Sequence, residues 1–271
     1  MAHLYTRDYR TITDEEREEY ERVLLLEKPA GRKHGRVNHY DLYPEGVKHY
    51  LSLFPNNHLV LSELKKRDLS ELNSRFSQVI HDSASTERDI ARFIKVNDAY
   101  YIIASILNGC GFRVGHHATY LFPEFELRAN GKTDYRADYL LLGKGSGGYE
   151  FVFVELESPN VGAILQCGYP AKGTRSGQMQ IKDWERWLDN YYSELASFFE
   201  KEKGGHEKLS DEFYHYDSTR MHYVVVSGTR SDYNDNSYYN RRSEMKKSGV
   251  ILLHYDNLVD YSEELPERNT F

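Results

Sequence analysis

The segment Tyr149–Ser158, which reads YEFVFVELES, constrains the fold more than any other stretch of the chain. Residues two apart on a β-strand share a face. The apolar residues therefore form two sets, with Tyr149, Phe151 and Phe153 on one face and Val152, Val154 and Leu156 on the other. A strand that is apolar on both faces is typical of the buried centre of a sheet covered by helices.

Glu155 and Glu157 end this strand and point the same way, since they are two residues apart. Burying two carboxylates is costly unless a cation neutralises them. The alternative is that the strand emerges into solvent at Glu155, because charged side chains at strand ends are common.

A third carboxylate, Asp138, lies in the preceding predicted strand, Arg136–Gly143 (RADYLLLG). The glycine-rich turn GKGSGG lets the two strands pair as an antiparallel hairpin. We expect Asp138 near the start of its strand and Glu155 near the end of the next, so the two side chains should be adjacent. Converging carboxylates form the oxygen-rich site that Mg²⁺ or Mn²⁺ prefers.

Two helical residues are candidates to join these acids. Gln180 lies near the start of a predicted helix over residues 176–205 and falls on one line with Trp184, Trp187 and Tyr191, which places it toward the sheet. It could orient a water or a phosphate, or be an ordinary polar residue of the first turn. Glu87 shares a helical face with Ile90 and Ile94, and could reach the site or simply complement the helix dipole.

The order of the remaining elements predicts the fold class. From residue 85 onward the pattern is α-β-β-α-β-α-β, with a helical stretch over 85–112 that is broken near Asn97 and Asp98, a strand over 221–230 and a final strand within 250–260. This order predicts an α/β fold with a mixed sheet flanked by helices. Residues 1–82, which are more charged and mostly helical in pattern, are expected to form an N-terminal region of unknown role.

The net charge of −7 gives no overall electrostatic attraction to nucleic acid. Any electrostatic binding of nucleic acid must come from local clusters of Lys and Arg, each of which could equally be a solvated surface patch. The candidate clusters are Arg32, Lys33 and Arg36; Lys65, Lys66 and Arg67; and Arg241, Arg242, Lys246 and Lys247.

Several classes of protein are disfavoured. The two cysteines, Cys110 and Cys167, form no CxxC pair, so no structural zinc site is indicated. The polar start and the lack of any apolar run of about 20 residues predict a soluble, cytoplasmic protein with no membrane contact. No P-loop or GxGxxG is present, so we expect no nucleotide cofactor. The adjacent His116 and His117 should point apart in a strand and make a poor metal pair.

These residues resemble the PD-(D/E)XK nuclease superfamily, and within it the Shedu family of bacterial anti-phage nucleases. The resemblance extends over about Glu87–Leu258 and rests on an ordered set of segments: RADYLLL, FVFVELESPN, QIKDWERWL, VVVSGTR and RRSEMKKSGVILLHYDNLV. One position departs from the superfamily pattern, because Glu157 stands where a lysine is usual. That lysine helps to position the attacking water, so the change leaves its charge-stabilising role to a second metal ion or to Lys172 and Arg175.

The resemblance implies a PD-(D/E)XK (restriction-endonuclease-like) domain over residues 83–271. It implies a metal-dependent DNA endonuclease in anti-phage defence that uses Mg²⁺ or Mn²⁺ and assembles as a homo-oligomer. Together with the residue patterns above, the expected roles are catalytic for Asp138, Glu155, Glu157 and Gln180; metal-binding for Asp138, Glu155, the Leu156 carbonyl and Glu87; and nucleic-acid-binding for Lys172, Arg175, Arg241 and Arg242. The alternatives are an inactive module that binds nucleic acid or a partner protein, and a nuclease that acts on RNA.

Overall fold

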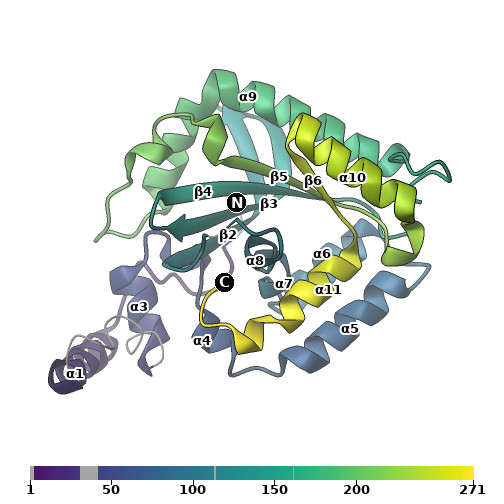
Figure 1. The fold of residues 1–271 in the computed structure, drawn as a ribbon. Coiled ribbons are helices and arrows are strands. Elements are labelled where there is room, and N and C mark those ends of the chain that lie inside the picture. The colour runs from purple at the N-terminus through teal and green to yellow at the C-terminus, as the bar shows by residue number, and fades with distance from the viewer. Residues whose placement is uncertain (1–2, 31–41, 113, 161) are drawn as a thin grey trace.

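The computed structural model describes residues 3–30, 42–112, 114–160 and 162–271. Its centre is a six-stranded mixed sheet in which the strands follow one another in sequence order (Figure 1). The strands are β1 (His58–Leu59), β2 (Ala118–Ala129), β3 (Lys132–Gly145), β4 (Gly148–Leu156), β5 (Met221–Val226) and β6 (Val250–Leu253). Strands β1 to β4 pair antiparallel, whereas β4, β5 and β6 run parallel. The predicted α/β class is therefore confirmed.

The described helices are α1 (Asp14–Ala30), α3 (Pro44–Leu51), α4 (Leu61–Leu64), α5 (Leu69–His81), α6 (Glu87–Val96), α7 (Tyr101–Ala104), α8 (Ile106–Gly109), α9 (Lys172–Glu202), α10 (Asp235–Ser248) and α11 (Tyr255–Glu263). The predicted break in the helical stretch after residue 85 is confirmed, because α6 ends at Val96 and Asp98 has a positive φ of 46°. No helix in the described ranges is long and apolar enough to span a membrane.

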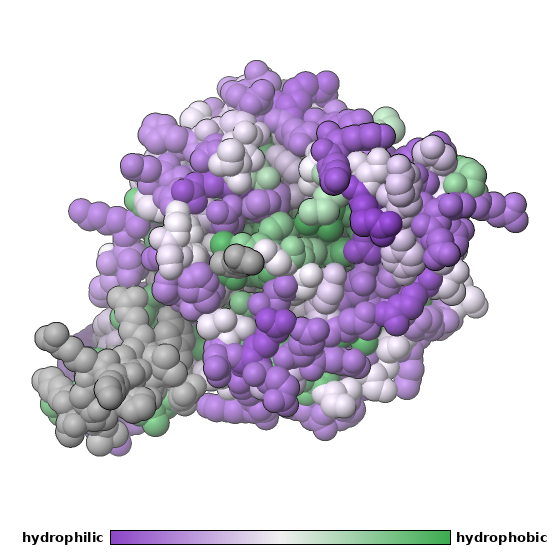
Figure 2. All heavy atoms as spheres, viewed as in Figure 1, coloured by the Kyte–Doolittle hydropathy of each residue, from purple (hydrophilic) through white to green (hydrophobic). Residues whose placement is uncertain are grey.

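Each face of the sheet has its own hydrophobic core, as the double-sided pattern of β4 predicts. Helix α9 covers one face, where Phe151 and Phe153 pack with Ile181, Trp184 and Leu188. Helices α5, α6, α7, α8 and α11 cover the other face (Figure 1). There the buried side chains of β4 are Val152, Val154 and Leu156. On the outer surface hydrophilic residues predominate, and hydrophobic residues gather near the centre of the face in Figure 2.

The hairpin differs from the predicted one in its extent. Strand β3 begins at Lys132 and runs to Gly145, so the turn is reduced to Ser146 and Gly147. Asp138 consequently lies in the middle of its strand, not near the start. The longer strand reflects its partner β2, which the sequence pattern did not reveal and which pairs with β3 along most of its length.

The final strand predicted within residues 250–260 is confirmed as β6, which ends at Leu253, and helix α11 begins at Tyr255. The change from strand to helix has a local cause, because the His254 backbone N–H donates to Asn257 Oδ1 at 3.2 Å in a capping box. Leu258 is fully buried against the helical core.

The N-terminal segment shares these cores. Strand β1 pairs with β2, helix α5 packs against α11, and Leu59 and Phe76 belong to the same cluster as the β4 side chains. The hydrophobic core therefore crosses the predicted boundary between residues 82 and 83, and a separate role for residues 1–82 stays a prediction.

Candidate metal centre

Strands β3 and β4 separate at Asp138, and this fork defines the site. Their pairing ends with Tyr139 opposite Val154, while β3 continues alongside β2. At the fork, the backbone N–H of Leu156 donates to Asp138 Oδ2 at 2.6 Å. A side-chain carboxylate thus takes the position of the next ladder acceptor, which brings Asp138 beside Glu155 as the sequence predicts.

Glu155 is the most buried of the acids, with 7% of its surface exposed. Burial raises its pKa well above the ordinary range, and the neighbouring Asp138, Glu157 and Glu87 raise it further. The Gln180 side chain, which reaches across from α9, opposes this by a hydrogen bond that lowers the pKa. Oε2 of Glu155 is buried and has no hydrogen-bond partner among the described residues.

Asp138 shares this environment. Burial is the main reason that its pKa is raised, and the Leu156 N–H opposes the rise. The charges of Glu87, Glu157 and Glu124 each raise the pKa further. Asp138 and Glu155 therefore destabilise each other as anions, and one or both favour the protonated form unless a cation is bound.

Glu157 is held in place through its backbone and through helix α9. Its N–H donates to Val226 O at 2.8 Å, and its carbonyl accepts from the Tyr255 hydroxyl at 2.7 Å. Its carboxylate accepts a hydrogen bond from the backbone of Gly177, while burial and then Glu87 raise its pKa from 4.5 to about 7. A Cβ atom at Gly177 would lie 3.3 Å from Glu157 Oε1, so glycine permits this close approach.

Glu87 lies at the rim of the site. It is the first residue of α6 and is exposed, although partial burial of the carboxyl still raises its pKa. The loop after β4 fixes the start of this helix, because the Asn160 side chain donates to Asp82 O at 2.7 Å and to Ser85 O at 2.8 Å. Glu87 is near enough to the acids of the hairpin to raise the pKa of Asp138, Glu155 and Glu157, and a metal-binding role for it stays a prediction.

The donor set fits a divalent cation. Carboxylate oxygens are the ligands that Mg²⁺ and Mn²⁺ prefer, and an unpartnered buried oxygen is available on Glu155. No Lys or Arg in the described ranges forms an ion pair with Asp138, Glu155 or Glu157. Within residues 3–30, 42–112, 114–160 and 162–271, however, no group of three His, Cys, Asp or Glu side chains is arranged so that it could hold a metal ion.

Leu156 contributes to the site through its backbone alone, since its side chain is buried in the helical core. The N–H group is used by Asp138. A metal-binding role for its carbonyl stays a prediction.

Two residues near the site were not singled out from the sequence. Tyr255 is fully buried, and its contact with Glu157 joins residues 98 positions apart, which no local sequence pattern indicates. Glu124 has a positive φ of 49° on β2 and raises the pKa of Asp138. The sequence pattern around Glu124 does not indicate this position, because β2 is defined by its pairing with β3.

The predicted basic residues are not paired with the acids. Lys172 and Arg175 are exposed in the first turn of α9, the helix that carries Gly177 and Gln180. Arg241 lies on α10 and donates to Asn257 Oδ1 at 3.4 Å, and Arg242 beside it is exposed. In the predicted cluster of Lys65, Lys66 and Arg67, the Arg67 side chain has a structural role, because it donates to Asp98 O at 2.7 Å. The cluster of Arg32, Lys33 and Arg36 lies outside the described residues.

Comparison with known proteins supplies the family. A search of curated proteins finds no match. A family model described as Shedu protein SduA, C-terminal, matches residues 84–259, which is well over half of the chain and includes all the acids of the site. The chain therefore belongs to the Shedu family.

Proposed function

We propose that this protein is a metal-dependent endonuclease of the PD-(D/E)XK type that hydrolyses DNA phosphodiester bonds in the cytoplasm during anti-phage defence. One observation carries the proposal: Glu155 is buried beside Asp138 at the end of the hairpin, with an unpartnered oxygen and no Lys or Arg of the described residues paired to either acid. Membership of the Shedu family supports the defence role.

In this proposal Asp138 and Glu155 hold one Mg²⁺ or Mn²⁺, with Glu87 and the Leu156 carbonyl available to complete the ligand set. The bound cation would supply the Lewis acid for phosphodiester hydrolysis. The Leu156 N–H orients Asp138, and Gln180 orients Glu155. Glu157 could accept a proton near neutral pH, since its pKa is raised to about 7.

DNA would approach along the start of α9. Lys172 and Arg175 are exposed in the turns before Gly177, whose backbone contacts Glu157. Phosphate contacts from these two cations would bring a strand next to the acids. Arg241 and Arg242 on α10 are proposed as a second, more distant contact. Assembly into a homo-oligomer, which would present paired sites, is proposed from the family resemblance alone.

A second candidate is an inactive module that binds nucleic acid. The observation that favours it is Glu157, an acid where the superfamily pattern has a lysine, with no cation among the causes that set its pKa. A nuclease that acts on RNA is the third alternative.

The test is nicking of supercoiled plasmid by the purified protein with Mg²⁺, Mn²⁺ or EDTA, beside the same assay on single-stranded RNA. Asp138→Asn and Glu155→Gln should abolish cleavage, whereas Glu194→Gln, an exposed acid on α9, should leave it unchanged. DNA binding without cleavage under both metals would favour the inactive module. Cleavage of RNA alone would favour the third alternative, and cleavage by both site variants would overturn the proposed site.

A further inference from the structure

A cavity of about 490 Å³ lies at the opposite end of the β3–β4 hairpin from the acids. Lys144 on β3 and Tyr149 on β4 line it, and each is six residues along its strand from Asp138 or Glu155. At the rise of a β-strand this separation is about 20 Å. The cavity is therefore distinct from the candidate metal centre, and its size is that of a small-molecule site.

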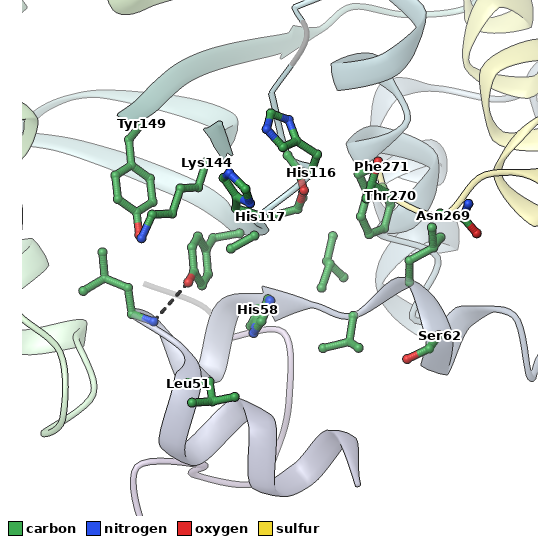
Figure 3. A pocket seen from close by; sticks show the side chains of 18 of the residues that line it. Leu51, His58, Ser62, His116, His117, Lys144, Tyr149, Asn269, Thr270 and Phe271 are labelled. Atoms are coloured by element: carbon green, nitrogen blue, oxygen red, sulfur yellow. Dashed lines mark hydrogen bonds between the residues drawn. The ribbon is translucent and has the colours of Figure 1, made fainter. Parts of the chain in front are cut away.

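One side of the cavity carries basic groups. Lys144 projects into it beside His116 and His117 (Figure 3). The Lys144 ammonium lies 5.2 Å from the centroid of the Tyr149 ring, and it forms no ion pair within the described ranges. An ammonium group that is held in place by an aromatic ring and lacks a carboxylate partner is suited to bind an anion.

The walls are aromatic and aliphatic. The rings of Tyr120 and Tyr149 have centroids 6.4 Å apart and are tilted by 35°. The Tyr120 ring is fixed because its hydroxyl accepts from the Leu53 N–H at 3.0 Å. Leu51 and Phe271 add apolar surface, so a flat ring could be enclosed between aromatic and aliphatic groups.

A single acid completes the lining. Glu207 borders the cavity and lies close enough to Tyr149 to raise the pKa of that hydroxyl. An anion alone would be repelled by this carboxylate. A ligand that carries hydroxyl groups between a flat ring and an anionic group would contact the tyrosine walls, Glu207 and Lys144 together. The Glu207 carboxylate suits the hydroxyl groups, since a carboxylate accepts hydrogen bonds from sugar hydroxyls.

We propose that this cavity binds a nucleoside monophosphate. The base packs between the tyrosine rings and the Leu51 side chain, Glu207 accepts from the ribose hydroxyls, and Lys144 binds the phosphate. The lack of a P-loop or GxGxxG does not bear on this site, because its lining comes from segments spread between Leu51 and Phe271 and not from one glycine-rich loop. The proposal is independent of nuclease activity.

The experiment is calorimetric titration of the full chain, in EDTA, with AMP, GMP, CMP and UMP, and with adenosine and inorganic phosphate. At least one monophosphate should bind with a micromolar Kd, and its nucleoside and phosphate should each bind at least tenfold more weakly. The same monophosphate should raise the thermal unfolding midpoint, because the ligand joins the N-terminal, hairpin and C-terminal segments.

Lys144→Met should weaken the monophosphate at least tenfold while leaving the nucleoside unaffected. The matched control is Lys132→Met, an exposed lysine at the other end of β3, which should bind as the wild type does. Far-ultraviolet circular dichroism checks that both variants fold. The proposal is overturned if none of the four monophosphates binds, if only an oligonucleotide binds, or if the two folded lysine variants bind the monophosphate equally.

Discussion

The carboxylate of Asp138 accepts the backbone N–H of Leu156 at 2.6 Å and thereby ties the middle of β3 to the end of β4. This bond places an acid beside the buried Glu155 at the point where the two strands separate. The stability of the metal-free protein and its affinity for a divalent cation should consequently oppose each other at these positions.

Glu155→Gln should stabilise the metal-free protein while abolishing cleavage. In the wild type this carboxyl must either be buried as an anion or remain protonated above its ordinary pKa, and the amide avoids both costs. We expect the free energy of unfolding at pH 8 in EDTA to rise by about 1–3 kcal/mol, the scale measured for buried polar groups. Urea denaturation measures it, with Glu194→Gln as the exposed control. A lower free energy of unfolding for Glu155→Gln than for the wild type would contradict the idea that burying this carboxyl destabilises the metal-free protein.

The stability of the metal-free protein should fall as pH rises from about 5 to 9. Burial raises the pKa of Asp138 and Glu155, and that of Glu157 moves from 4.5 to about 7. The folded state therefore binds more protons than the unfolded state in this range. Each such proton lowers the free energy of unfolding by about 1.4 kcal/mol per pH unit.

Thermal unfolding in EDTA across this pH range checks the sign. Glu155→Gln should flatten the curve relative to the wild type. A stability that increases from pH 5 to pH 9 in the wild type would contradict the raised pKa values.

Divalent metal should stabilise the protein more at pH 8 than at pH 6, because the acids must lose protons to bind it. We expect Mn²⁺ at millimolar concentration to raise the unfolding midpoint and to release protons measurably in a weakly buffered titration. Asp138→Asn should lose most of both effects. Equal midpoint shifts in the wild type and in Asp138→Asn would place the metal elsewhere.

Gly177→Ala should displace Glu157. The added Cβ would lie 2.9 Å from Val225 Cγ1 and 3.3 Å from Glu157 Oε1, so either the helix or the carboxylate must shift. We expect a loss of about 1–3 kcal/mol in stability, the usual cost of overpacking, and a larger proportional loss of cleavage. Ser176→Ala, exposed on the same turn, is the control for both assays. Wild-type cleavage by Gly177→Ala would remove Glu157 from the mechanism.

The sequence predicts the parts of the site that depend on local periodicity. The alternation in β4 places Glu155 and Glu157 together, and the glycine-rich turn brings Asp138 beside them. The line of apolar residues on α9 correctly directs Gln180 toward the sheet, where it bonds Glu155.

The parts that were missed depend on contacts distant in the chain. Strand β2 contains Pro123 and the positive-φ residue Glu124, which interrupt a strand pattern, and its pairing with β3 defines it instead. The capping box at His254 separates β6 from α11 and begins that helix directly after the strand. The buried hydroxyl of Tyr255 reaches Glu157 only because α11 packs across the sheet.

The most direct test of the metal centre is a crystal structure of the protein soaked in Mn²⁺, with anomalous diffraction recorded to locate the ion. We expect one strong peak at about 2.1 Å from carboxylate oxygens of both Asp138 and Glu155, the distance expected for a small hard cation. It would be contradicted by carboxylates that stay apart with no peak between them, or by Mn²⁺ bound only elsewhere on the chain.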